Sequence, residues 1–212
     1  MMHPDTELRY VSEAIGYGVF ATHFIPKGTI VYTKDPLEIE ISEEQFSQYP
    51  VVFQDVIEKY SYVDERGIRI ISWDHAKYVN HCCECNTMST GYGFEIAIRD
   101  IEAGEEITDE YGLLNLSYAM QLHCEKPGCR CEVSPNDFRD YGATWDVTVK
   151  HALSLVQTVR QPLWTLLDQG TQKAVTSFPQ EPAHYRSVFA LKWENAFSTN
   201  GANGLFEHPG SR

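Results

Sequence analysis

The feature that most constrains this chain is the order of three short segments within its first 112 residues. Gly16-Tyr17-Gly18 comes first, followed by Lys77–Asn86 (KYVNHCCECN) and, 17 residues later, by Gly104–Gly112 (GEEITDEYG). Glycine has no Cβ and accepts positive φ, so the Gly-Tyr-Gly segment would let the backbone approach a ligand closely. Each segment alone is typical of a loop or a turn. Their combination in this order carries the information about function.

The sequence up to Cys131 predicts a mainly β domain with one helical insert. Short apolar or β-branched runs separated by turn signals predict strands near residues 10–11, 18–21, 29–32, 68–71 and 93–98. At the insert, Ser42 is a suitable helix cap and Gln45 occupies the third helical position, as in a capping box. Apolar residues continue to Ile57, so we expect helix across this region.

In the last third of the chain the spacing of apolar residues becomes helical. These residues recur at helical spacing between Trp145 and Leu167, with Pro162 as an interruption, and predict a helix or a kinked helix pair. The stretch Tyr185–Phe197 fits a helix or a strand equally well. Residues 198–204 (STNGANG) are typical of a flexible tail.

Acidic residues outnumber basic ones, with 30 Asp and Glu against 17 Lys and Arg. Residues 1–131 hold 22 of the acidic and 10 of the basic residues. A surface of this charge repels phosphate, which argues against direct nucleic-acid binding and favours a basic polypeptide as partner. A solvated acidic surface without a partner would explain the same counts.

Length and hydropathy indicate a globular protein. At 212 residues and 42% apolar content, the chain is long enough for one full domain plus an appendage. It has no apolar run near the roughly 18–20 residues that span a bilayer, and its first residues lack the order of a secretory signal. We therefore expect no membrane partner and an intracellular location, cytoplasmic or, in a eukaryote, nuclear.

Six cysteines fall into two tight groups, at positions 82, 83 and 85 and at positions 124, 129 and 131. This pattern favours a metal site over a disulfide framework. In a reducing compartment, closely spaced thiolates are natural zinc ligands.

In content and order, the three segments resemble the signature segments G-x-G, R-F-x-N-H-x-C-x-P-N and E-L-x-x-D-Y of the SET-domain protein methyltransferases. The resemblance covers roughly residues 8–135. It implies a mainly β fold with some α, the SET-domain fold, in which small curved sheets bring the Asn80-His81 and Tyr111 segments together through a knot-like threading. It also implies transfer of a methyl group from S-adenosylmethionine to a lysine ε-amine of a protein.

The resemblance further implies which residues hold S-adenosylmethionine. The G-x-G segment would lie beside the methionine moiety, Asn80 would hydrogen-bond the cofactor, and His81 would contribute backbone contacts and packing. The implied cofactor-binding set is Gly16, Tyr17, Gly18, Asn80, His81 and Phe138, the last as an aromatic that would stack on the adenine or form a wall of the lysine channel. Without the resemblance, an ordinary turn, a satisfied Asn-His pair at a strand end and a core phenylalanine would be the simpler interpretations.

Tyr111 matches the active-site tyrosine of the family. Methyl transfer from a sulfonium is an in-line displacement that needs a neutral amine, although free lysine has a pKa near about 10.4. The site must therefore desolvate the lysine and align nitrogen, methyl carbon and sulfur. Three positions depart from the family pattern. Asp109 stands where Tyr or Phe is usual, Glu110 where Asp is usual, and Lys77 where Arg is usual, so methylation state and choice of nucleophile do not carry over.

The run Cys124–Cys131 (CEKPGCRC) resembles the post-SET zinc segment C-x-C-x-x-x-x-C-R, with Leu122 where the first cysteine should be. The ligand set that this implies for one structural Zn²⁺ is Cys83, Cys124, Cys129 and Cys131. Four thiolates at about 2.3 Å would make a closed, structural site. His123 is a rival ligand, and buried cysteines without metal are the other interpretation.

These observations divide the chain into a SET domain at 8–121, a zinc segment at 122–135, a helical C-terminal extension at 136–197 and a flexible tail at 198–212. The predicted function is methylation of a lysine in a basic protein or peptide substrate. The alternatives are a non-catalytic SET module that binds a protein partner and a methyltransferase that acts on another nucleophile. The substrate protein, the methylation state and the oligomeric state have no signature in the sequence.

Overall fold

A computed structural model describes residues 1–122, 124 and 126–194. The predicted tail at 198–212, the last three residues of the predicted extension and His123 lie outside the described residues. No helix among the described residues is long and apolar enough to cross a membrane.

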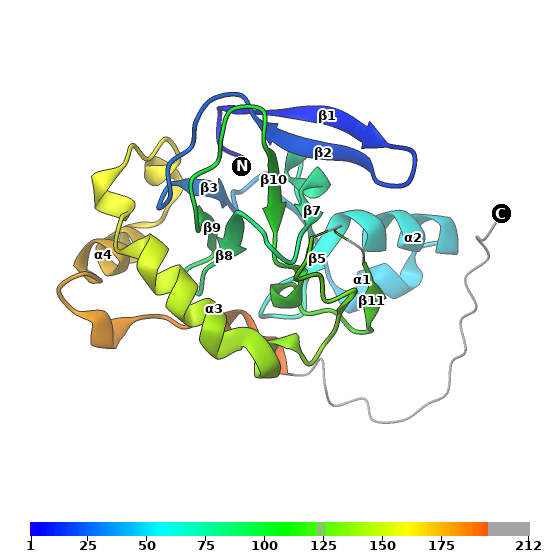
Figure 1. Cartoon of the computed structure of the whole chain (residues 1–212). Helices are drawn as coiled ribbons and strands as arrows, with labels where there is room; N and C mark the ends of the chain where they lie inside the picture. The colour runs from blue at the N-terminus through cyan, green and yellow to red at the C-terminus, as the bar shows by residue number, and fades with distance from the viewer. Residues whose placement is uncertain (123, 125, 195–212) are drawn as a thin grey trace.

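Short strands dominate the first two thirds of the chain (Figure 1). The strands are β1 (Thr6–Ser12), β2 (Gly16–Ala21), β3 (Ile30–Thr33), β4 (Ile39–Ile41), β5 (Ser61–Val63), β6 (Arg69–Ile71), β7 (Asn80–His81), β8 (Thr87–Ser89), β9 (Phe94–Ala97), β10 (Glu106–Asp109), β11 (Met120–Gln121) and β12 (Glu132–Val133). The helices are α1 (Glu43–Gln48), α2 (Val51–Tyr60), α3 (Asp137–Leu153) and α4 (Gln169–Ser177). The predicted β character of this region is confirmed.

The strands form small sheets rather than one large one. The orders are β1-β2-β10-β7, β3-β9-β8 and β4-β6-β5, and β11 pairs with β12. Strands β7 and β10 run parallel, with Thr108 opposite Asn80 and Asp109 opposite His81. This pairing places the Asn-His segment directly beside the strand that leads into Tyr111. The second and third of the three segments are therefore neighbours in space.

The predicted helical insert is confirmed, with its cap. The Ser42 side chain accepts from the backbone N–H of Gln45, and the Gln45 side chain accepts from the N–H of Ser42, which completes a capping box. The insert is two helices because Pro50, which has no N–H to donate, separates α1 from α2.

The C-terminal helices share a core with the central sheets. Val149, Ala152 and Leu153 of α3 are fully buried in the same apolar cluster as Phe94 and Ile96 of β9. Figure 1 shows α3 lying along β8 and β9. The extension therefore completes the hydrophobic core on which the site rests.

The predicted helix between Trp145 and Leu167 is confirmed only in its first part. Helix α3 ends at Leu153, well before Pro162. The later apolar residues lie in or beside short 3₁₀ turns at 156–158 and 164–166. Those residues still reach the core, since Val156 and Leu163 are 1% and 3% exposed. Helical spacing thus predicted which residues are buried, but it did not predict that their backbone lacks α-helical conformation. Of the ambiguous stretch from 185, the described part contains a 3₁₀ turn at 188–191, neither α-helix nor strand.

Candidate functional site

The Gly-Tyr-Gly and Asn-His segments meet at one end of the β1-β2-β10-β7 sheet. Nδ2 of Asn80 donates to the carbonyl of Tyr17 at 3.1 Å and to Oε1 of Glu106 at 2.7 Å. At Gly18 there is no room for a side chain, because an added Cβ would lie 2.3 Å from Oε1 of Glu106. Gly16 has φ of +85°, a conformation that L side chains rarely adopt. A side chain at position 16 would thus strain the backbone, and one at position 18 would displace the Glu106 carboxylate from Asn80.

His81 connects the Asn-His segment to the strand end that carries Tyr111. Its Nδ1 lies 3.1 Å from the carbonyl oxygen of Asp109 and 3.3 Å from the backbone nitrogen of Tyr111. Its Nε2 lies 3.4 Å from Sγ of Cys83. Burial, together with the nearby Arg130 cation, lowers the pKa of His81 to about 4, so the ring is neutral at physiological pH. A neutral ring packed in this way connects the Asn-His segment to the end of β10 and to Tyr111.

The Tyr111 hydroxyl donates to the carbonyl of Val79 at 2.7 Å. Its ring lies 5.4 Å from the His81 ring, centroid to centroid. Burial, and then the nearby carboxylates of Asp109 and Glu95, raise the pKa of the phenol well above its usual range. The hydroxyl is therefore a neutral donor and acceptor at physiological pH, not a phenolate base.

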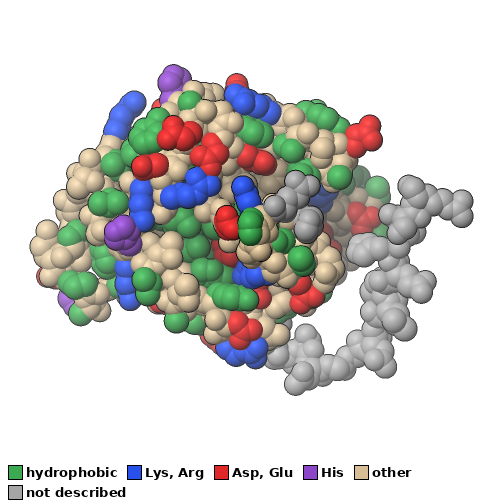
Figure 2. All heavy atoms as spheres, in the orientation of Figure 1, with side chains coloured by type: hydrophobic (Ala, Val, Ile, Leu, Met, Phe, Trp, Pro, Cys, Tyr) green, Lys and Arg blue, Asp and Glu red, His purple; other side chains and the backbone are tan. Residues whose placement is uncertain are grey.

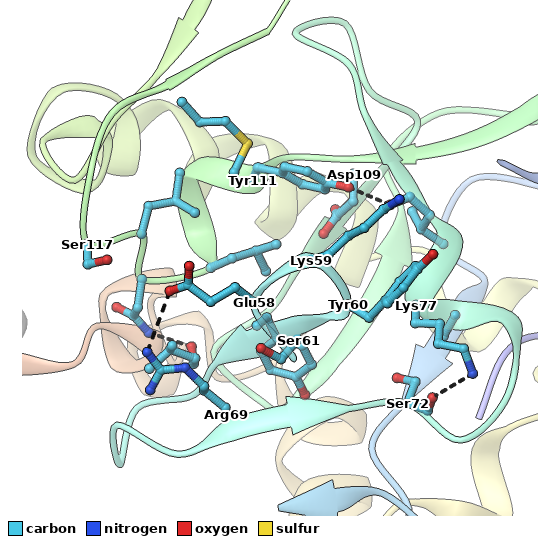
Figure 3. A pocket seen from close by; sticks show the side chains of 18 of the residues that line it. Glu58, Lys59, Tyr60, Ser61, Arg69, Ser72, Lys77, Asp109, Tyr111 and Ser117 are labelled. Carbon is cyan, nitrogen blue, oxygen red and sulfur yellow. Dashed lines mark hydrogen bonds and ion pairs between the residues drawn. The ribbon is translucent and has the colours of Figure 1, made fainter. Parts of the chain in front are cut away.

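Tyr111 lines a cleft that the helical insert and the loop after Tyr111 enclose (Figure 3). Side chains at the end of α2, among them Lys59 and Tyr60, lie across the cleft from Tyr111 and Asp109. The other lining residues come from β3, β5, β6, β9 and the segments 72–79 and 114–120. The cleft mixes aromatic, acidic and basic side chains, a lining that can bind an extended polar side chain.

Two acidic residues of the cleft are shielded from solvent, Asp109 fully and Glu95 in part. Asp109 is 3% exposed, and its burial and the nearby Glu110 charge raise its pKa to about 7. Burial and the charge of Asp109 raise the pKa of Glu95 well above its usual range. The sequence signal for Glu95 was slight, a single acid inside an apolar strand, and it was missed.

Three of the four predicted zinc ligands lie together. The Sγ atoms of Cys83, Cys124 and Cys129 are all within 4.8 Å of one another. Backbone N–H groups of Cys124 and Cys131 donate to Sγ of Cys129 at 3.5 and 3.4 Å, and they lower the pKa of this thiol to about 6. The donor set fits a thiophilic ion such as Zn²⁺. Cys131, at a left-handed φ of 59°, does not join the group of three.

Arg130, within the cysteine segment, was not predicted from the sequence. Its Nη2 donates to Oε1 of Glu110 at 2.6 Å, and its Nη1 lies 3.3 Å from Oδ2 of Asp137. Its guanidinium also lies 4.8 Å from the centroid of the Tyr141 ring. One side chain therefore ties the cysteine segment both to the residue before Tyr111 and to α3.

Of two other residues singled out by the sequence, Phe138 lies away from this arrangement and Lys77 lines the Tyr111 cleft. Phe138 is 2% exposed and packs against Trp145 and Phe189, and it does not line the Tyr111 cleft. Lys77 extends along its own segment, where Nζ donates to the carbonyl of Ser72 at 3.4 Å. A cofactor role for Phe138 stays a prediction.

A family model for the SET domain matches residues 16–112. This chain contains a SET domain. The match begins at the first glycine of Gly-Tyr-Gly and ends at the glycine after Tyr111, so it contains all three segments. The small sheets are those of a SET-domain fold, and a C-terminal helical region follows them in the chain.

Two Plasmodium falciparum proteins resemble the chain. The variant-silencing SET domain-containing protein is 29% identical over an alignment of 212 positions, which covers 92% of this chain and 8% of that protein. The chain thus spans a small part of this relative's length. A crystal structure of a protein described as a candidate histone methyltransferase has 18% identity and a TM-score of 0.39, and covers 52% of this chain and 95% of that one. Neither fold nor function is inferred from a TM-score of 0.39.

Proposed function

We propose that this SET domain transfers a methyl group from S-adenosylmethionine to a lysine of a protein substrate. The observation that carries the proposal is the position of Tyr111, whose neutral hydroxyl lines an open cleft while β10 and β7 connect it to Asn80. A cofactor held at Asn80 and a lysine entering the Tyr111 cleft would approach each other from opposite ends of these paired strands.

The residues around Asn80 fit the cofactor. Nδ2 of Asn80 is used by Tyr17 and Glu106, whereas Oδ1 accepts no hydrogen bond from the described residues and could accept one from an α-amino group. At Gly16 no atom lies within 4 Å of the place a Cβ would take, so the backbone there is open to close approach of a ligand. When bound, S-adenosylmethionine supplies an electrophilic methyl group on a sulfonium.

The chain's own residues would prepare the acceptor amine. Tyr111 would orient the amine through its hydroxyl, whose position Val79 fixes. The aromatic lining of the cleft, including Tyr32, Tyr60 and Tyr62, would remove water from the lysine and lower the pKa of its ammonium group. Orientation and desolvation are what an in-line displacement requires.

Cys83, Cys124 and Cys129 would hold a structural Zn²⁺, with Cys131 as the proposed fourth ligand. Cys131 lies two residues from Cys129, and its backbone N–H already contacts the Cys129 sulfur. A bound ion would fix the loop that carries Arg130. Its role would be to hold this loop against Glu110, with no part in the methyl transfer.

A basic protein is the proposed substrate class. The chain has a formal net charge of −13, which attracts basic polypeptides and disfavours nucleic acid. Figure 2 shows acidic and basic side chains interspersed on one face rather than gathered in a single acidic patch. Recognition of a cation therefore falls mainly to the cleft, where Glu58, Glu95 and Asp109 all line the walls.

The proposal is tested by incubating the full chain with methyl-labelled S-adenosylmethionine and a cell extract, followed by mass spectrometry of labelled bands. Label on lysine is the expected result. Label on another nucleophile would support a methyltransferase whose acceptor is not lysine. Absence of label, together with absence of S-adenosylmethionine binding by calorimetry, would favour a non-catalytic module that binds a protein partner.

A further inference from the structure

Two carboxyl side chains from different sheets, Glu95 of β9 and Asp109 of β10, line the cleft that holds Tyr111. Asp109 is 3% exposed, and its Oδ1 is 3.4 Å from the donating hydroxyl of Thr87. Oε2 of Glu95 is buried and has no hydrogen-bond partner among the described residues. Buried carboxylates are normally paired or fully hydrogen-bonded, so the buried oxygen of Glu95 lacks a partner.

The basic side chains that line the cleft do not supply that partner. Arg69 pairs with glutamates of α1 and α2, and Lys77 donates to a backbone carbonyl. The Lys59 ammonium lies over a tyrosine ring, 5.2 Å from its centroid. Within the described part of the chain, no Lys, Arg or His forms an ion pair with Glu95 or Asp109. The N-terminal ammonium is near enough to lower the pKa of Glu95, but it pairs with Asp35 at 2.9 Å.

The groups that face Asp109 are neutral or acidic. They are Glu95 from β9, the phenol of Tyr111, the adjacent Glu110, the thiol of Cys85 and the hydroxyl of Thr87. Two carboxylates held this way cannot both ionise without cost, and each raises the proton affinity of the other. A cation that enters the cleft would remove that cost.

We propose that Glu95 and Asp109 bind the cationic side chain of the substrate at the bottom of the Tyr111 cleft and accept its proton before methyl transfer. The inference rests on the proposed function and assigns this task to two residues that family resemblance does not provide. Because Asp109 stands where Tyr or Phe is usual, the cleft selects its acceptor by charge as well as by fit.

The proton and electron balance of the step is simple. The substrate ammonium gives one proton to a carboxylate of the pair and becomes a neutral amine. The nitrogen lone pair then forms the bond to the methyl carbon as the carbon–sulfur bond of the sulfonium breaks, and its electron pair stays on sulfur. The methylated product is again an ammonium, and the carboxyl group returns its proton to solvent.

The test compares Asp109→Asn and Glu95→Gln with Glu65→Gln, an exposed carboxylate outside this cleft. Methyl transfer to the extract protein that the wild type labels is measured from about pH 6.5 to 10. We expect either cleft variant to lose about tenfold or more in kcat/KM near pH 7 and to recover toward wild type as solvent deprotonates the lysine near its own pKa of about 10.4. Affinity for S-adenosylmethionine should stay unchanged.

A loss of equal size at every pH would show a merely structural role, and wild-type rates near pH 7 in both variants would overturn the inference. A second readout does not depend on transfer, namely binding of fluorescent poly-L-lysine. Glu95→Gln should weaken this binding and Glu65→Gln should not. If the wild type neither binds S-adenosylmethionine nor labels any protein, the proposed function is wrong. In that case poly-L-lysine binding still tests the cation site, and unchanged binding by Glu95→Gln would overturn it.

Discussion

Arg130 donates from Nη2 to Oε1 of Glu110 at 2.6 Å, and Glu110 immediately precedes Tyr111. The pair is shielded from solvent, with side chains 17% and 3% exposed. Glu110 also accepts from the backbone N–H of Gly112, on the other side of Tyr111. The cysteine segment therefore acts directly on the backbone that positions the tyrosine, which explains how a remote structural metal could affect the cleft.

Arg130→Ala should destabilise the protein by about 3–5 kcal/mol, because it leaves the buried Glu110 carboxylate without its partner. Urea unfolding of both proteins measures this difference. Arg139→Ala is the matched control, since Arg139 forms an exposed pair with Asp140 and should cost no more than about 1 kcal/mol. Equal effects of the two substitutions would contradict a clamping role for Arg130.

Purified protein should contain about one equivalent of zinc, and Cys129→Ser should lower this to less than half. The reason is that Cys129 supplies one of three converging thiolates. Removal of the metal by a chelator should lower the Tm, since the loop that carries Arg130 is then released. Metal analysis by mass spectrometry gives the content, and Cys85→Ala, which removes a core thiol outside the group, should retain the metal. Metal-free wild-type protein from zinc-supplemented cells would exclude the site.

Asn80→Ala should raise the Kd for S-adenosylmethionine about tenfold or more. The substitution removes the amide that connects the Gly-Tyr-Gly and Asn-His segments, together with its unused acceptor oxygen. Isothermal titration calorimetry measures the affinity. Asn136→Ala, just before α3, is the control and should bind like the wild type. Unchanged affinity in Asn80→Ala would remove Asn80 from the cofactor site.

Asp109→Asn should stabilise the protein most above neutral pH. Burial and the charge of Glu110 raise the pKa of Asp109 from 3.8 to about 7. An acid with a higher pKa in the folded state holds its proton more tightly when folded. The free energy of unfolding therefore falls as pH rises from about 4 to about 7, and stays lower above that.

Thermal unfolding of the wild type and Asp109→Asn at about pH 5 and pH 8 measures this effect. The Tm advantage of the variant should be larger at pH 8 by several degrees, at about 2–4 °C per kcal/mol for a chain of this size. The same advantage at both pH values would mean that Asp109 ionises in the folded protein as it does in the unfolded chain.

Local chemistry and family resemblance account for different parts of what the sequence predicted. The Ser42 capping box was predictable because its hydrogen bonds join residues three apart. The meeting of Asn80 with the strand before Tyr111 followed from resemblance, since no local pattern encodes a parallel pairing across 28 residues. Helix beyond Leu153 was wrongly predicted, because tertiary burial maintains the apolar spacing without α-helical backbone.

The residues that were missed owe their importance to tertiary placement. Glu95 is a single acid in an apolar strand, and its burial beside Asp109 depends on two sheets meeting. Arg130 lies in a loop where the cysteines form the recognisable pattern. Its partners Glu110 and Asp137 are brought to it by the fold. Neither relationship has a signature in residue spacing.

The most direct test of the central claim is the rate of methyl transfer by Tyr111→Phe. This substitution removes only the hydroxyl that donates to Val79, at a cost of about 1 kcal/mol of stability, so the protein should stay folded. We predict that transfer falls at least about tenfold, with S-adenosylmethionine affinity preserved, and that Tyr49→Phe, an exposed tyrosine after α1, keeps the wild-type rate. Equal methylation by Tyr111→Phe and the wild type would contradict the proposed role of Tyr111.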